Sequence, residues 1–336
     1  MKSDLTESIS PPPVDNEPLY RSDERTGKIS FLKKLVALLV VLLIFFFLGK
    51  SLYHNIGELS AQKWSIKPLP LIFSFFLLII NLAISAYVWE KILRLFGTHL
   101  PFKQSFKIMS LSGLGKYLPG KIWLYLSQIY LSQKAKISKS VCLFSLLLLF
   151  AAYNLAGLLV FIASLFLWKR FSPASISLLF LAGGSIFLAI FSPRIFNGML
   201  KIVSRIFKNL QEKFPHSGMT FQAGFKPAVE IILILLADWL IFGVAVYFLV
   251  NSFYPINLSQ TVILCGIFAI SSILGILSFF VPAGLGVREG VQSYLLSLFI
   301  PVSAAILISL AMRIWMTLGE LMCFFVALKI KKPEVW

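Results

Sequence analysis

The feature that most constrains this chain is the length of its uncharged, apolar runs. No charged residue occurs from Trp239 to Val287, and residues 68–89 form another run without charge. A transmembrane helix needs about 20 consecutive, predominantly apolar residues. The chain is 58% hydrophobic and 13% charged, whereas about a quarter of the residues in a soluble domain are charged. The sequence therefore predicts an all-α, polytopic integral membrane protein, and it argues against a soluble fold, a disulfide scaffold and a nucleic-acid-binding protein.

The apolar runs predict about eight membrane-crossing helices. Asn251, Tyr254-Pro255 and Asn257 divide the longest run into two spans, because these residues favour turns. The segment near 113–132 is expected to be re-entrant or broken, since the lysines that follow it return the chain to the side from which it came. The predicted crossing segments, of which the seventh is short, are residues 32–53, 68–89, 140–168, 171–193, 228–250, 258–281, 287–300 and 302–328.

The basic residues are distributed unevenly along the chain, which predicts its orientation. With the N-terminus on one side, 24 of the 31 Lys and Arg fall on that side and five on the other. Because cytoplasmic loops carry an excess of Lys and Arg, both termini are expected in the cytoplasm, with the protein in the cytoplasmic (inner) membrane. Residues 1–30 are polar and are expected to form a disordered cytoplasmic tail. Residues 31–332 are expected to form a single helical membrane domain.

Two segments of this domain, 112–123 and 281–290, place Gly and Pro beside basic residues. Gly and Pro interrupt helix hydrogen bonding, and such a break within a bilayer is tolerated where the backbone is buried in protein or lines a wet cavity. The helix that begins after a break offers unpaired N–H groups that attract anions. Lys121 and Arg288 stand in the first turn of the two expected helices. Paired broken segments are also a usual sign of a transporter's binding site.

Ionisable residues inside the apolar runs are the second functional signal, because such residues are rare and are usually paired or functional. One hypothesis is a structural network in which Arg313 pairs with Asp238 or Glu289. The other is that Arg288 and Arg313 hold an anionic headgroup, since Arg suits bidentate contact with phosphate. In that case the acids are candidate coupling groups or charge partners: Glu230, Asp238 and Glu320.

Other site chemistry is poorly supported by the sequence. The three cysteines lie in apolar runs, and the three histidines are scattered without metal-ligand spacing. Neither a metal site nor a cofactor is expected. Catalysis needs a general base or metal-binding carboxylates, and no pair of acids stands in a loop. The chain is therefore not expected to be an enzyme by itself.

The sequence resembles the lysylphosphatidylglycerol synthase transmembrane-region family, whose members are described as flippase-like. Three motifs carry the resemblance: Gly115-Lys116-Tyr117-Leu118-Pro119-Gly120-Lys121, Pro282-Ala283-Gly284-Leu285-Gly286-Val287-Arg288-Glu289, and Arg313-Ile314-Trp315 followed by Gly319. The family commonly has Pro-Gly-Gly in the second motif, where this chain has Ala283. The resemblance implies a membrane domain that handles lipids or lipid-linked anions. The soluble aminoacyl-transferase domain of the larger synthases is not expected in this chain.

These observations predict a protein that binds an anionic phospholipid or a polyprenyl-phosphate-linked substrate and translocates it across the cytoplasmic membrane. The alternatives are a non-catalytic subunit that positions a lipid-modifying enzyme and, less favoured, a lipid-linked glycosyl or aminoacyl transferase. The predicted headgroup-binding residues come from the two broken segments and the last span: Lys116, Tyr117, Pro119, Gly120, Lys121, Pro282, Gly284, Gly286, Arg288, Glu289 and Arg313.

Overall fold

A computed structural model describes residues 66–117, 122–168, 172–192, 224–278, 281 and 284–331, together with positions 46, 50, 53, 194 and 198. The elements in this part of the chain are helices. The α-helices are α3 (Pro68–Leu95), α4 (Phe102–Gly113), α5 (Ile122–Lys134), α6 (Lys139–Trp168), α7 (Pro173–Ile190), α10 (Phe225–Phe253), α11 (Thr261–Leu277), α12 (Val287–Leu296) and α13 (Val302–Lys329). Two short 3₁₀ helices, η1 (Leu114–Tyr117) and η2 (Leu258–Gln260), precede α5 and α11.

Five of the described helical segments are long and apolar enough to cross a membrane, so the all-helical, polytopic prediction is confirmed, whereas the count of about eight is not. The five are α3, α6, α10, η2 together with α11, and α13. The predicted first span at 32–53 lies outside the described residues, apart from isolated positions. The predicted span at 171–193 corresponds to α7, whose apolar part is shorter than a full span.

The segment predicted to cross at 287–300 contains a helix that is too short for a full span. Helix α12 has ten residues, which is about 15 Å at 1.5 Å per residue, half of a hydrocarbon core of about 30 Å. It runs back along α11: Gly284 and Arg288 lie against Gly275 near the end of α11. At the other end of the pair, Leu296 lines the same small pocket as Leu264. Helices α11 and α12 thus form a hairpin, called the second hairpin below, whose two ends lie on one side of the molecule.

Helices α4 and α5 form the first hairpin, as the sequence predicted for this segment. The start of α4 lies beside the end of α13, where Lys107 Nζ donates a hydrogen bond of 2.7 Å to the carbonyl oxygen of Ile330. At the other end of α4, the Tyr117 hydroxyl lies 3.1 Å from Thr317 Oγ1, near the middle of α13. Helix α5 then returns toward the end from which α4 began, and it packs along α4.

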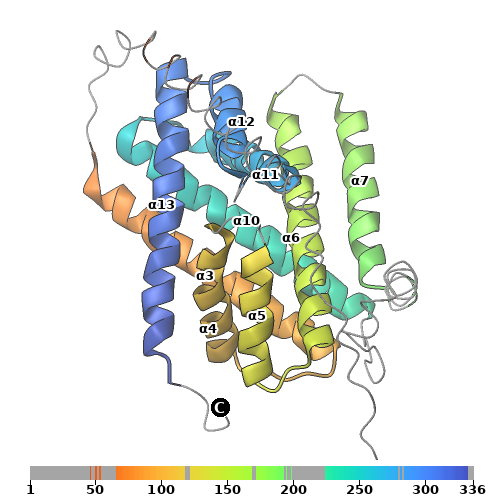
Figure 1. Cartoon of the computed structure of the whole chain (residues 1–336). Helices are drawn as coiled ribbons and strands as arrows, with labels where there is room; N and C mark the ends of the chain where they lie inside the picture. Colours follow the sequence, from red (N-terminus) through yellow and green to blue (C-terminus); the bar gives the residue numbers. More distant parts are fainter. Residues whose placement is uncertain are drawn as a thin grey trace, which may run out of the picture.

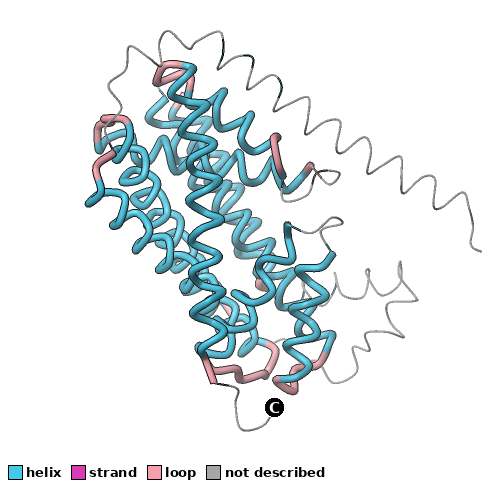
Figure 2. Tube along the Cα trace, turned by 60° about the vertical axis from the view of Figure 1, so that its left-hand side comes forward, coloured by secondary structure: helices cyan, strands magenta, loops and turns pink. Residues whose placement is uncertain are grey.

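The two hairpins approach the middle of the molecule from opposite ends. In Figure 1, α4 and α5 occupy the lower half of the view, whereas α11 and α12 occupy the upper half. Long helices flank each hairpin in the chain: α3 and α6 flank the first, and α10 and α13 flank the second. Figure 2 shows α13 running through the full height of the bundle beside both hairpins.

The packing follows the same plan in both halves. Helix α4 packs on α13 of the other half, and α11 packs on α6 of the other half. Helices α3 and α10 pack on each other along their lengths and run in opposite directions. The N–H of Lys67, before α3, bonds to the carbonyl oxygen of Ser252 at the end of α10, and Lys91 near the end of α3 pairs with Glu230 near the start of α10. The described chain is therefore an inverted repeat, α3–α6 and α10–α13. The sequence alone did not predict this symmetry, because it assigned different topologies to the two broken segments.

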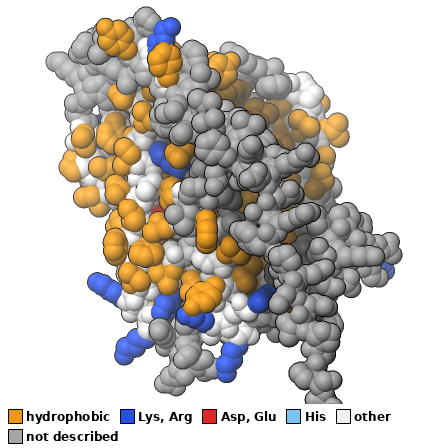
Figure 3. All heavy atoms as spheres, in the orientation of Figure 1, with side chains coloured by type: hydrophobic (Ala, Val, Ile, Leu, Met, Phe, Trp, Pro, Cys, Tyr) orange, Lys and Arg blue, Asp and Glu red, His pale blue; other side chains and the backbone are white. Residues whose placement is uncertain are grey.

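Most of the basic side chains visible on the described surface lie at one end of the molecule (Figure 3). On the face shown in Figure 3, hydrophobic side chains cover the middle, and Lys and Arg gather at the lower edge, where α13 ends. Exposed aliphatic side chains of α7 and α13 illustrate the apolar belt, among them Leu178, Leu181 and Ile314. Such a belt is stable in contact with lipid, and it would be a large apolar patch on a water-soluble protein.

Candidate functional site

A cavity of about 450 Å³ lies where the two hairpin tips meet α13. The tip of the first hairpin is η1, and the tip of the second is the segment from Gly284 to Arg288. Among the predicted site residues, six line this cavity: Lys116, Tyr117, Gly284, Arg288, Arg313 and Glu320. The two broken segments and the last span, which are far apart in the sequence, therefore form one site.

Two glycines allow the second tip to turn close to α11. Gly284 has φ +67°, and Gly286 has φ +81°, a region that L side chains rarely adopt. A Cβ atom on Gly284 would lie 2.8 Å from the carbonyl oxygen of Gly275. The tip of the first hairpin is equally close to its own second helix, since a Cβ on Gly115 would lie 2.9 Å from the backbone nitrogen of Leu124.

An ion pair holds the first tip to α13. The Lys116 ammonium group pairs with the Glu320 carboxylate. The Tyr117 hydroxyl donates a hydrogen bond of 3.0 Å to the other oxygen of Glu320. Glu320 is only 9% exposed, so both of its contacts form in a partly dehydrated environment, where charge-assisted hydrogen bonds are stronger than in water.

A second ion pair joins the second hairpin to α13. Arg313 Nη1 lies 3.5 Å from Glu289 Oε1, and the Glu289 side chain is almost completely buried. The other oxygen of Glu289 accepts a hydrogen bond of 2.6 Å from the N–H of Gly286. Glu289 therefore caps its own helix and occupies a donor that the sequence reasoning had left for a ligand. The predicted pairing of Arg313 with Glu289 is present.

Arg288 differs from the other two cations of the cavity. Its guanidinium group lies 4.1 Å from the centre of the Phe268 ring, and Nη2 donates a hydrogen bond of 3.1 Å to the sulfur of Met316. No carboxylate oxygen of the described residues lies within 4 Å of it. A thioether is a weak acceptor, so most of the hydrogen-bonding capacity of this guanidinium is unused. Three cations and two carboxylates thus surround the cavity, which leaves one positive charge uncompensated.

The structure also places the remaining predicted residues. Pro119, Gly120, Lys121 and Pro282 lie outside the described residues. Glu230 pairs with Lys91 at the end of the molecule and is not near the cavity. Asp238 does not line the cavity either; it faces Asn81 between α3 and α10.

Sequence reasoning missed the apolar wall of the cavity. This wall is formed by residues from α5, α6, α11 and α13: Leu124, Tyr125, Phe150, Gly275, Ile276 and Met316. No signal in the sequence distinguishes these residues from lipid-facing ones. Thr317 was also missed, although its spacing from Arg313 and Glu320 puts it on their helix face, where its hydroxyl donates a hydrogen bond of 2.9 Å to the Arg313 carbonyl oxygen.

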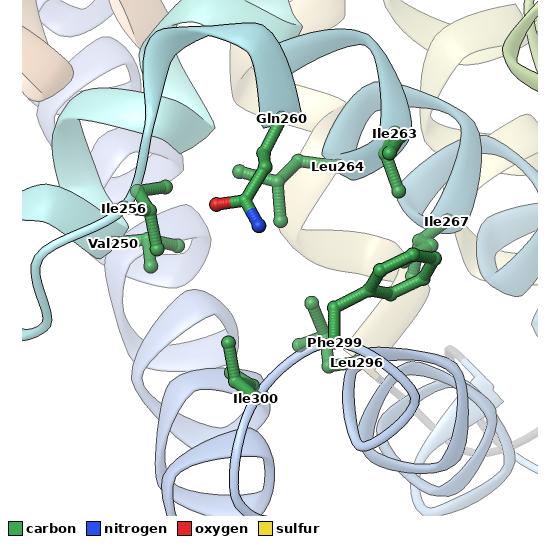
Figure 4. Close-up of a pocket in the computed structure, with 9 residues that line it drawn as sticks. All are labelled: Val250, Ile256, Gln260, Ile263, Leu264, Ile267, Leu296, Phe299 and Ile300. Carbon is green, nitrogen blue, oxygen red and sulfur yellow. The ribbon is translucent and has the colours of Figure 1, made fainter. Parts of the chain in front are cut away.

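A second, smaller pocket lies at the opposite end from the C-terminus. Figure 4 shows eight apolar side chains and the Gln260 amide around it, from the end of α10, the loop that follows, η2, α11 and the end of α12. Its volume of about 20 Å³ holds one or two water molecules. This pocket is too small to bind a lipid headgroup, so the cavity between the tips is the candidate site.

Within the described residues, no group of three or more His, Cys, Asp or Glu is arranged to hold a metal ion. The model of the lysylphosphatidylglycerol synthase TM region matches residues 34–319, so the chain belongs to this family. No curated protein matched the sequence. Family membership and the five apolar helices together identify a multi-pass membrane protein.

Proposed function

We propose that this member of the lysylphosphatidylglycerol synthase transmembrane-region family binds an anionic phospholipid or a polyprenyl-phosphate lipid in the cavity between the hairpin tips and moves its headgroup across the cytoplasmic membrane. The single observation that carries the proposal is Arg288, a cation without a carboxylate partner within 4 Å among the described residues. A half-buried guanidinium group without a carboxylate partner gains most from a phosphate ligand, which it can bind with two hydrogen bonds.

The apolar wall supports a lipid ligand in preference to a free anion. The cavity offers cations on one side and side chains such as Tyr125, Phe150 and Ile276 on the other. A headgroup phosphate would contact Arg288, while the first carbons of the lipid chains would contact these apolar groups. A small inorganic anion would leave the apolar wall without a partner, which forfeits the hydrophobic contribution to binding.

The two ion pairs suggest how movement would begin. A phosphate beside Arg288 would compete with Glu320 for Lys116 and with Glu289 for Arg313. Each exchange would loosen one hairpin tip from α13. Because the hairpins come from opposite ends, loosening one tip at a time would expose the cavity to one side and then to the other, as in transporters built from inverted repeats.

The same carboxylates support binding in preference to catalysis. Glu289 and Glu320 are both engaged with a cation, so neither is disposed as a general base. The chain is therefore proposed to carry out no chemistry on its lipid. A role in positioning a lipid-modifying enzyme remains the second hypothesis, and the transport experiment separates it from translocation.

The first prediction concerns Arg288→Ala. A hydrogen bond to a charged group contributes about 1.5–3 kcal/mol, so the variant should bind anionic lipid about ten- to a hundredfold more weakly. Proteoliposomes that contain fluorescent phosphatidylglycerol, or in a parallel arm a fluorescent polyprenyl phosphate, would measure binding and movement between leaflets. The two arms identify which lipid is carried.

The matched control is Lys103→Ala, which removes an exposed cation at the start of α4. It should bind and move lipid as the native protein does. Equal movement in native, Arg288→Ala and protein-free vesicles would refute translocation. Arg288-dependent binding without any movement would favour the positioning role.

A further inference from the structure

The acid that lies deepest between the two repeats is Asp238, and it is not part of the cavity. It lies near the middle of α10 and has no exposed surface. Asn81, near the middle of α3, donates a hydrogen bond of 2.7 Å to Asp238 Oδ1 and another of 3.2 Å to the Asp238 carbonyl oxygen. Among the described residues, no donor reaches Oδ2 and no Lys or Arg nitrogen lies within 4 Å of the carboxyl group.

This environment stabilises a neutral carboxyl group. Burying an ionised carboxylate without a cation costs several kcal/mol, and one amide hydrogen bond offsets only part of that cost. If position 238 served only to form a hydrogen bond between α10 and α3, an amide side chain there would be sufficient. A carboxyl group adds the ability to bind and release a proton, and intramembrane acids commonly serve this purpose.

Asp238 is connected to the cavity through Tyr153 of α6. The Tyr153 carbonyl oxygen accepts a hydrogen bond of 3.1 Å from the indole N–H of Trp239, the residue that follows Asp238. The Tyr153 ring also packs on Trp239, with 4.9 Å between the ring centroids. Phe150, one helical turn before Tyr153, lines the cavity. Packed side chains of α6 and α10 therefore link the surroundings of Asp238 to the cavity that Arg288 lines.

We propose that Asp238 is a proton-binding site whose occupancy is coupled to anion binding at Arg288, so that one proton is taken up with each anionic headgroup. This inference depends on the proposed function. In this proposal the positive charge of Arg288 favours the ionised form of Asp238 through space, and a bound phosphate cancels that charge. Anion binding thus promotes proton binding at a carboxyl oxygen of Asp238, and by linkage a bound proton promotes anion binding to the same extent.

The charge balance suits transport through a bilayer. Once Asp238 has released its proton and Arg288 its anion, the positive Arg288 and the ionised Asp238 sum to zero. With a monoanionic phosphodiester on Arg288 and a proton on Asp238, the sum is again zero. In both the loaded and the unloaded form, these groups carry no net charge. The protein can therefore change conformation without moving net charge through the low-dielectric interior, where an uncompensated charge is energetically costly.

Few other titratable groups face Asp238. From α6 there is Tyr153 and from α11 there is Cys265, whose thiol contacts the carbonyl oxygen of the adjacent Trp239. Helix α7 contains no charged residue. The charged groups that α13 contributes to the cavity are already paired, Arg313 with Glu289 and Glu320 with Lys116. Helix α3 contributes the uncharged Asn81.

The test is the pH dependence of lipid binding, measured with phosphatidylglycerol in nanodiscs for the native protein, Asp238→Asn and Glu230→Gln. Asp238→Asn is permanently neutral and keeps a side chain of the same shape. Native affinity should increase as pH falls, by up to about tenfold per pH unit in the range where Asp238 titrates. Asp238→Asn should bind at every pH about as tightly as the native protein does at its lowest pH. Glu230→Gln, which alters an acid near the start of α10, should behave as the native protein does.

Folding is checked by the melting temperature and monodispersity of each variant, and Asn81→Ala provides a second variant that leaves the carboxyl group in place and should retain a pH dependence. Native binding that depends on Arg288 but not on pH would refute the proton site and leave the proposed function standing. A pH dependence that persists unchanged in Asp238→Asn would also refute it. No binding of anionic lipid by the native protein at any pH would instead refute the proposed function.

Discussion

At the scale of single residues, the buried charged groups differ in whether they face an oppositely charged partner. Lys116 and Arg313 each face a carboxylate, and both pairs hold a hairpin tip to α13. Arg288 faces a ring and a thioether, and Asp238 faces an amide. The charged groups that lack an oppositely charged partner within 4 Å among the described residues are therefore the ones to which we assign the anion and the proton.

A prediction at this scale concerns Gly284→Ala. The substitution places a Cβ atom 2.8 Å from the Gly275 carbonyl oxygen, in a backbone conformation with φ +67°. Both effects destabilise the second tip, by about 1–3 kcal/mol. The melting temperature in detergent should fall.

The control is Gly184→Ala in α7, where a Cβ atom would meet no other heavy atom within 4 Å. Because alanine favours helix over glycine by about 1 kcal/mol, this variant should be as stable as the native protein or slightly more stable. A melting temperature for Gly284→Ala equal to that of the control would contradict the close approach at the tip.

At the scale of elements, the hairpins are the units that bring charge into the middle of the molecule. Helices α4 and α12 are too short to cross a bilayer, at about 18 Å and 15 Å. Each ends or begins at a Gly-containing tip, and the described backbone of the second tip packs closely against α11 at Gly275. This arrangement satisfies the rule that irregular backbone within a membrane is buried or lines a cavity.

The depth of the tips is testable by labelling single cysteines with a bulky maleimide that does not cross membranes. Leu114→Cys and Leu285→Cys, one at each tip, should resist the reagent from both sides. Lys103→Cys, at the start of the first hairpin, should react from one side only, and Asn257→Cys, before the second, from the other side only. The three native cysteines are buried and provide a low background.

Rapid labelling of Leu285→Cys from the side that labels Lys103→Cys would show that the second hairpin crosses the membrane. That result would restore the topology expected from the sequence and remove the inverted repeat.

At the scale of the whole molecule, the inverted repeat and the charge asymmetry serve different purposes. The repeat places two hairpins on opposite ends of one cavity, which is the geometry required for access from either side. The basic residues break this symmetry, because they gather at the end where α13 finishes (Figure 3). We therefore expect the orientation in the membrane to follow from the basic residues, because the repeat itself does not distinguish the two sides.

The corresponding prediction is that the C-terminus lies in the cytoplasm, on the side with 24 of the 31 basic residues. A green fluorescent protein fused after Trp336 should fluoresce, and a periplasmic phosphatase fused at the same place should be inactive. An active phosphatase with a dark fluorescent protein would reverse the orientation and place the Lys-rich end outside.

Much of the site could be predicted from residue types, because charged and Gly/Pro residues in an apolar chain are conspicuous. Lys116, Arg288, Arg313 and Glu320 were all selected in this way, and the structure brings them together. Asn81 carried a similar signal, as the single amide in the apolar run 68–89, but it was not selected. The partner of Arg313 was left open between Asp238 and Glu289, since hydropathy does not determine which helices are neighbours.

The sequence by itself determined the class of the molecule, because about 20 consecutive apolar residues can be stable only as helices in lipid, and it determined the expected orientation through its basic residues. Only the tertiary structure showed that the segment at 287–300 turns back along α11. Hydropathy reports the environment of a helix but not its direction, and α12 mixes apolar residues with Arg288, Glu289 and Gln292. Direction follows from packing against α11 and α13, through contacts such as Glu289 with Arg313, and it is these contacts that leave Arg288 facing the cavity.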